Sequence, residues 1–197
     1  MNRTLWYKLA YVGATVGLGV VTLVIWRGFG YSSEALVVIV LLLLIPGRLQ
    51  GYLWRDLYRG RRLISTGQWQ KGEEHLERFL TQIRNRPWLK RLMGLSWSFH
   101  TWNVEALTRN NLGAIRLELA DLAAAEKELR AACELDPKYP VPYFNLAILA
   151  RMRGNIEESE KLLSRARALG YTGGTSDQLA QLAAEALARV EGRGTTS

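Results

Sequence analysis

Apolar and polar residues recur with helical spacing through the second half of the chain, and the pattern repeats itself. The segment 106–139 aligns with 140–173 at an offset of 34 residues. The identical pairs are Asn111/Asn145, Leu112/Leu146, Glu126/Glu160, Lys127/Lys161, Leu129/Leu163, Ala132/Ala166 and Leu135/Leu169. A period of this length is typical of helical hairpins that stack on one another and bury one face of each. The pattern therefore predicts an all-α stack over these residues.

Small residues occupy fixed places in each repeat. Gly113 and Ala147 each follow a leucine in the first helix, where a small side chain lets the second helix approach. Asp136-Pro137 ends the first unit, because the residue before proline is driven out of the α region. Over 106–173 the chain resembles the tetratricopeptide repeat family. Arg109 departs from the family pattern, which has an aromatic residue at this position, whereas Tyr143 supplies one in the next repeat.

The segments on either side of the two repeats show a weaker helical pattern. A degenerate hairpin, with poorly matched small residues, is predicted from about Leu53 to Arg86, and 55–105 is interpreted as this hairpin plus an insertion. Apolar residues at helical spacing over 177–190 predict a capping helix within 174–191, which would shield the last repeat. The tail 192–197 is expected to be disordered.

The first 54 residues follow a different pattern. No charge occurs from Leu9 to Trp26, a length that suits a membrane-spanning helix. A second apolar run supports a further span at about 34–54, with a bent or re-entrant segment at Pro46 as the alternative. A cleaved signal peptide is a competing interpretation of the first run, but no small-residue cleavage pattern follows it. We therefore expect residues 1–54 to form a transmembrane helical hairpin.

Charge indicates an orientation. The chain carries a formal charge of +8, and Arg48, Arg55, Arg59, Arg61 and Arg62 follow the second apolar run. By the positive-inside rule, both termini would face the cytoplasm at a bacterial-type inner membrane. Nucleic acid is not an expected partner, because neither a groove-reading motif nor an RNA-binding signature is present. Gly13 and Gly17 form a GxxxG pair, for which packing within the chain is favoured over a homodimer.

The insertion before the repeats mixes tryptophans with basic residues, as a membrane interface requires. In the competing interpretation, these tryptophans pack against the repeats. The predicted membrane-surface residues, which would contact lipids, are Arg55, Arg59, Arg61, Arg62, Trp88, Lys90, Arg91, Trp97 and Trp102.

Catalytic chemistry has little support in this sequence. His75 and His100 each lack a second ligand one helical turn away, so no zinc constellation is apparent. Cys133 is interpreted as a small core residue. We expect no catalytic residue, no metal and no cofactor, and hence a protein that is not an enzyme.

The resemblance implies a function through the concave face of the stack. In this family the first helices line a groove for bound protein, and Asn111 and Asn145 occupy a position that often faces it. A hydrogen bond within the hairpin is the other interpretation of these asparagines. The remaining groove residues in this register are Asn110, Ala114, Glu118, Phe144, Ile148, Arg151 and Met152. The predicted function is a membrane-anchored adaptor or scaffold for protein–protein interaction; the alternative is an accessory subunit of a membrane enzyme or transport complex.

Overall fold

The computed structural model describes residues 3–28, 37, 48–49, 51–90, 101 and 103–194. The chain divides into two compact units, of which the first contains Met1–Leu53 and Gly94–His100 and the second contains Trp54–Met93 and Thr101–Ser197. Within the described ranges every regular element is a helix, so the predicted all-α class is confirmed.

The first unit contains α1, Arg3–Gly28, a helix of 26 residues. Across the described part of the chain, no helix combines the length and the apolar character needed to cross a membrane. The predicted two-span topology at a bacterial inner membrane, with both termini in the cytoplasm, is therefore wrong. That prediction rested on the absence of charge from 9 to 26, and absence of charge alone does not establish a helix that spans a membrane. Most of the second expected span, 34–54, lies outside the described residues.

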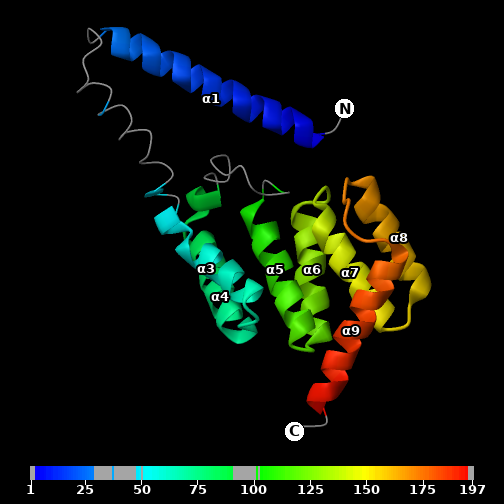
Figure 1. Ribbon diagram of the computed structural model, residues 1–197. Helices are drawn as coiled ribbons and strands as arrows, with labels where there is room; N and C mark the ends of the chain where they lie inside the picture. The colour runs from blue at the N-terminus through cyan, green and yellow to red at the C-terminus, as the bar shows by residue number, and fades with distance from the viewer. Residues whose placement is uncertain are drawn as a thin grey trace. The chain divides into compact units, whose positions relative to one another are not determined.

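The second unit contains three helical hairpins that stack side by side (Figure 1). Each hairpin packs on the next through its second helix, so that α5 lies against α4 and α7 lies against α6. The helices are α3 (Arg55–Ser65), α4 (Trp69–Asn85), α5 (Val104–Glu118), α6 (Leu122–Leu135), α7 (Pro140–Met152), α8 (Ile156–Ala168) and α9 (Ser176–Gly194).

Each hairpin closes over a pair of small residues. A Cβ atom on Gly113 would lie 2.5 Å from Leu129 Cγ, and one on Gly60 would lie 2.7 Å from Leu76 Cδ2. Neither site has room for a side chain, so glycine sets how closely the two helices approach. The pairs Gly60/Gly72, Gly113/Ala125 and Ala147/Ser159 share the same spacing. The small residues of the first hairpin therefore match the others well, contrary to the sequence prediction.

The turn within each hairpin has a residue in the left-handed region at the same repeat position. Gly67 has a φ of 72°, Ala120 of 69° and Gly154 of 76°. Alanine pays a steric cost there that glycine avoids. One residue later, Asp121 and Asn155 accept hydrogen bonds from the backbone N–H groups of Ala124 and Glu158 and so cap the second helices. The same turn geometry therefore recurs despite the change of residue.

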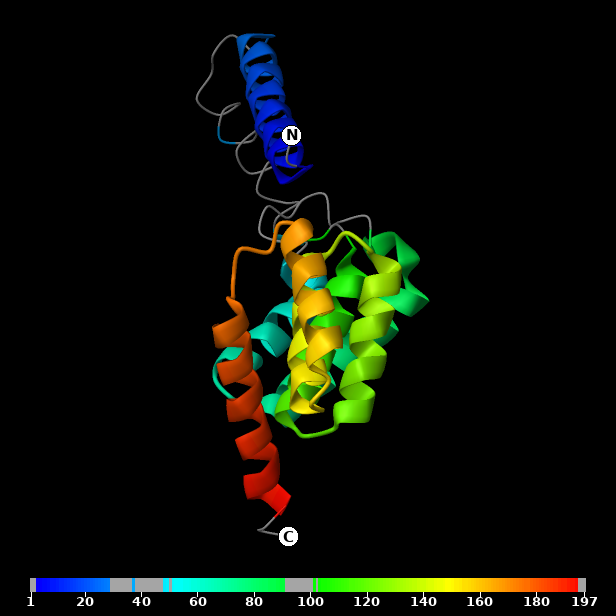
Figure 2. The ribbon, with the colours of Figure 1, turned by 90° about the vertical axis from the view of Figure 1, so that its right-hand side faces the viewer.

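The last helix, α9, does not extend the stack. It packs against α7 and reaches α5, whereas a helix continuing the series would lie mainly against α8. Figure 2 shows α9 on the side of α7 and α8 away from α6. The helix also runs to Gly194, beyond the start of the tail predicted at 192, and residues 195–197 lie outside the described residues. The predicted capping helix thus follows a different path, across the first helices of the hairpins.

Candidate protein-binding face

The predicted binding face is formed by α5 and α7, the first helices of the two clear repeats. Ala114 and Glu118 are four residues apart and therefore lie on one side of α5. Arg189 of α9 donates from Nη2 to Glu118 Oε1 at 3.1 Å. This ion pair places Glu118, at the C-terminal end of α5, against the last helix.

The asparagines join neighbouring hairpins. Asn145 Nδ2 donates to Asn110 Oδ1 at 3.0 Å, and Asn110 is buried. The predicted alternative, a hydrogen bond within one hairpin, does not describe this pair. Asn111 differs, because its Nδ2 is buried and has no hydrogen-bond partner in the described part of the chain. Asn145 thus has a structural partner, while Asn111 retains an unused donor.

The groove residues predicted on α7 are largely covered. Phe144 and Met152 are buried, and Ile148 and Arg151 are half-buried. Phe144 lies with its ring centroid 4.5 Å from that of Tyr171 and shares an apolar cluster with Leu179 of α9. Met152 shares a second cluster with Ala183 and Ala186 of α9. Part of the face that we predicted to be open is therefore occupied by the chain's own last helix.

A network of ion pairs joins the first two hairpins, and the sequence analysis did not predict it. Arg116 contacts three carboxylates, with Nε to Glu73 Oε1 at 2.9 Å, Nη2 to Glu77 Oε1 at 2.9 Å and Nη1 to Glu128 Oε1 at 3.3 Å. Arg109 Nη1 lies 2.8 Å from Glu128 Oε2. Burial opposes the charge of Arg116, but these carboxylates outweigh it and raise its pKa. The only sequence signal was Arg109 at an aromatic position of the repeat.

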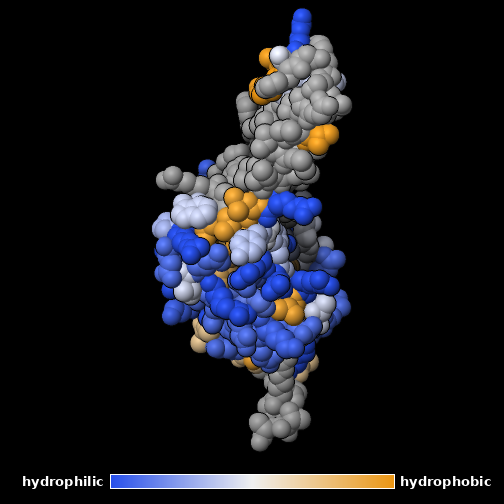
Figure 3. Space-filling model, turned by 90° about the vertical axis from the view of Figure 1, so that its left-hand side faces the viewer, coloured by the Kyte–Doolittle hydropathy of each residue, from blue (hydrophilic) through white to orange (hydrophobic). Residues whose placement is uncertain are grey.

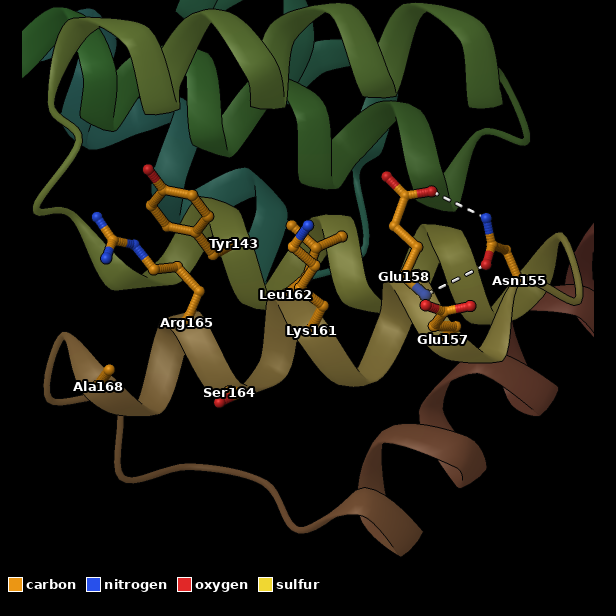
Figure 4. Close-up of a pocket in the computed structure, with 9 residues that line it drawn as sticks. All are labelled: Tyr143, Asn155, Glu157, Glu158, Lys161, Leu162, Ser164, Arg165 and Ala168. Carbon is orange, nitrogen blue, oxygen red and sulfur yellow. Dashed lines mark hydrogen bonds between the residues drawn. The ribbon is translucent and has the colours of Figure 1, made fainter.

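A depression in the surface lies along α8, with Tyr143 of α7 at one end (Figure 4). Its volume is about 740 Å³, and it is lined by Tyr143, Asn155, Glu157, Glu158, Lys161, Leu162, Ser164, Arg165 and Ala168. The Arg165 guanidinium lies 5.9 Å from the centre of the Tyr143 ring. Both signs of charge are present among the lining residues, which include Glu157, Glu158, Lys161 and Arg165.

The residues that could have carried chemistry have structural surroundings. His75 Nδ1 lies 2.7 Å from Asp56 Oδ1, which connects α4 to α3. Burial raises the pKa of the Cys133 thiol to about 11, so the thiol is protonated at neutral pH. No group of three metal-binding side chains occurs among the described residues. His100 lies outside the described residues.

The predicted membrane-surface residues fall into three groups. Arg55, Arg59, Arg61 and Arg62 are exposed on α3. Figure 3 shows that the coloured surface on the left-hand side of the view in Figure 1 is mostly hydrophilic, with smaller hydrophobic patches. Trp88 is half exposed, whereas Lys90 Nζ donates to Glu105 Oε2 at 2.7 Å. Arg91, Trp97 and Trp102 lie outside the described residues. Contact of this set with lipids stays a prediction.

Comparison with known proteins agrees with the hairpin geometry. The model of the tetratricopeptide repeat family matches residues 128–161. Residues 128–161 are thus similar to a tetratricopeptide repeat. The match begins within α6, covers α7 and ends within α8, so it includes one full period in a different phase from the two aligned segments. No curated protein matches the chain. Stacked helical repeats in general present extended concave surfaces for binding.

Proposed function

We propose that this protein is an adaptor that holds a protein partner against the face formed by α5 and α7. The observation that supports the proposal is the combination of a tetratricopeptide match with stacked hairpins, whose first helices α5 and α7 contain the predicted groove residues. Such a surface acts by binding alone: it holds a protein partner and needs no reacting group of its own. Asn111 lies on α5, and its buried side-chain N–H donor has no partner among the described residues.

A matched pair of alanine variants tests the adaptor. Ala114 is half-buried on α5, one turn before Glu118, whereas Ala123 is exposed on α6. Each is changed to glutamate, and proteins captured from the native source are quantified against wild type. Ala114→Glu is expected to lose most of the captured partner by crowding the binding face, while Ala123→Glu keeps it. Equal capture by all three proteins, with equal thermal stability, contradicts the adaptor.

A second candidate is an accessory subunit of a larger enzyme or transport complex. It is favoured by α1, on which Val16, Val20, Val21, Leu23 and Val24 are all more than half exposed. A helix that exposes a row of branched apolar side chains gains free energy when another subunit covers them. In this arrangement α1 would contact the other subunits, and the repeats would contribute a further contact surface.

Purification from the native source distinguishes the two candidates. A stoichiometric set of subunits that survives washing favours the complex, whereas exchangeable partners favour the adaptor. The double variant Val20→Asp with Val24→Asp places charge on exposed positions of α1 and is expected to release the chain from a complex. An adaptor that uses α5 and α7 alone would keep its partner in that variant.

A further inference from the structure

The path of α9 identifies what the binding face of α5 and α7 accepts. The helix has 19 residues and lies against α7 and α5, on the face where the proposed function places the partner. The inference below rests on that proposed function, because it concerns the same surface. A helix already seated in the groove reports the shape and the chemistry of any ligand that could replace it.

The contact of α9 follows a simple helical pattern. Leu179, Ala183 and Ala186 are spaced by four and then three residues, which places them on one side of the helix, and all three are buried. Arg189 follows three residues later and forms the ion pair with Glu118. The groove therefore accepts a helix with one large apolar residue, two small ones and a terminal cation.

This contact is small for a helix of its length. Alanine side chains bury little apolar surface, so much of the apolar contact depends on Leu179. Leu182 and Leu187 are 40% and 37% exposed, respectively, at the margins of the contact. The α9 helix is thus held by few groups, and another helix with larger side chains could bind in its place.

The groove is also incompletely filled. A depression of about 310 Å³ lies beside the contact, lined by Phe144, Tyr171 and Gly174 and by Gln178, Gln181, Leu182 and Glu185 of α9. Gln181 Nε2 donates to Glu185 Oε1 at 2.9 Å, and both residues are exposed. The edge of α9 beside Phe144 is therefore mostly polar, and this part of the groove stays open.

The segment between α8 and α9 allows exchange. Its glycines include Gly170 and Gly174, which have φ values of 94° and 89°. Gly174 lies close to Phe144, since a Cβ atom there would be 2.7 Å from Phe144 Cε2. The chain can therefore leave α8 and return along α7 only with glycine at this point, and the glycines give the segment backbone freedom once α9 is released.

We propose that α9 is an internal ligand of the α5–α7 groove and that the partner is an amphipathic helix of the same pattern, which binds by displacing it. The partner helix carries apolar residues at the places of Leu179, Ala183 and Ala186 and a basic residue that meets Glu118. Binding is consequently limited by the fraction of molecules in which α9 has left the groove.

The first test uses a fluorescent peptide with the sequence of residues 174–194 as the probe and the full-length protein as the receptor. Ala183→Glu places a charge on the buried side of α9, and Ala188→Glu places the same charge on its exposed side. Ala183→Glu is expected to release α9 and to bind the peptide about tenfold more tightly than wild type. Ala188→Glu is expected to bind like wild type. Equal affinity of all three proteins overturns the proposal.

The second test fixes α9 in place and does not depend on a destabilising variant. Cysteines replace Glu118 and Arg189 in a Cys133→Ala background, and a short bismaleimide joins them. The joined protein is expected to lose peptide binding relative to the same protein before joining. Undiminished binding after joining means that the peptide binds elsewhere and overturns the proposal.

A peptide that carries Leu179→Ala sharpens the assignment of the groove. It is expected to bind the Ala183→Glu protein about tenfold more weakly than the parent peptide, because Leu179 packs in the same cluster as Phe144. Affinity equal to or greater than that of the parent peptide contradicts the predicted ligand pattern. Light scattering of the Ala183→Glu protein is expected to show a monomer, whereas a dimer would make a second copy the occupant and overturn the proposal.

The peptide experiments and the test of the proposed function can fail independently of one another. If the peptide fails to bind any variant while Ala114→Glu still reduces capture of partners, the adaptor stands and the internal ligand fails. If the peptide binds the released protein but Ala114→Glu and Ala123→Glu capture partners equally, the groove accepts a helix and the adaptor fails.

Discussion

The two joints between successive hairpins occupy equivalent repeat positions and use different chemistry. At the joint between α4 and the α5–α6 hairpin, Arg109, Arg116 and Glu128 form ion pairs with one another and with Glu73 and Glu77. At the next joint the equivalent residues are Tyr143, Ala150 and Leu162. There an apolar cluster joins α6 to α7 through residues such as Leu129 and Leu149, and the ion pair between Glu126 and Arg153 lies at the more exposed margin.

The difference shows that the backbone period alone does not determine how neighbouring repeats adhere. An apolar joint gains stability from burial and responds weakly to salt. An ionic joint depends on every charge keeping its partner, and its exposed members are screened by salt. We call these the ionic joint and the apolar joint, and the following changes distinguish them.

The largest effect is expected from Leu149→Ala in the apolar joint. Leu149 is 2% exposed, and its truncation leaves a cavity that should cost about 3 kcal/mol of unfolding free energy. Urea unfolding at low and high salt measures it, and the loss should be the same in both. Leu182→Ala, at a residue 40% exposed, is the control and should change little. A strong salt dependence of the Leu149→Ala loss would contradict an apolar joint.

Arg116→Met should come next, in the ionic joint. The methionine replaces most of the stem but leaves Glu128, which is buried, without one of its cations. The unfolding free energy should fall by about 2 kcal/mol at low salt, and by less at high salt. Arg130→Met removes a surface pair whose arginine side chain is 56% exposed, and it should cost about 0.5 kcal/mol. An Arg116 loss no larger than that of Arg130 would mean that the ionic joint is only a surface feature.

A smaller effect, dependent on pH, is expected from Glu105→Gln. Burial opposes the ionisation of Glu105, but hydrogen bonds from Lys90 and Arg109 outweigh it and hold its pKa below the ordinary 4.5. A pKa lowered by folding stabilises the protein above the pKa of the unfolded chain, and this contribution disappears as the pH falls through the folded pKa.

Glu105→Gln should therefore lower the unfolding free energy by about 1 kcal/mol at neutral pH and match wild type in acid. Unfolding curves from pH 7 to about pH 3 measure the convergence over the range that this linkage sets. Glu134→Gln, at an exposed residue of α6, is the control and should follow wild type throughout. Curves that stay parallel down to acid would show that the ion pairs of Glu105 add nothing.

The smallest change in stability is expected when the charged residues of the ionic joint are replaced by those of the apolar joint. The triple variant Arg109→Tyr, Arg116→Ala and Glu128→Leu carries the residues of the apolar joint at the equivalent positions of the ionic one. Replacing buried ion pairs by apolar residues is often neutral. Of the carboxylates that remain, Glu77 is exposed and Glu105 keeps its pair with Lys90, so stability should stay within about 1 kcal/mol of wild type. The salt dependence should disappear. A triple variant less stable than Arg116→Met would show that the charges themselves specify this joint.

Most of the hairpin stack could be predicted from local pattern. The 34-residue period, the stripe of small residues and the capping residues Asp121 and Asn155 act within one hairpin, so the sequence displays them directly. The first hairpin also carried its signal: Gly60 and Gly72 have the spacing of Gly113 and Ala125, and comparing spacings would have revealed it.

The remainder depends on contacts between distant segments. Arg116 meets Glu73, 43 residues earlier, and a single sequence gives no reason to pair those charges among many. The amphipathic pattern of α9 indicated which side is buried but not the surface that buries it, so an end cap and a helix across α7 were equally consistent with it. Predicted groove residues such as Phe144 and Met152 therefore proved to be covered by α9.

The short connection from Ala168 at the end of α8 to Ser176 at the start of α9 sets a threshold for any competitor. A segment tethered so closely acts as if it were present at an effective concentration of the order of millimolar. A free helix of equal intrinsic affinity would have to reach a similar concentration to fill half of the grooves, which few cellular proteins do. The tether thus makes the groove respond to partners that bind more strongly than α9 or that are themselves held nearby, and ignore dilute helices that merely resemble it.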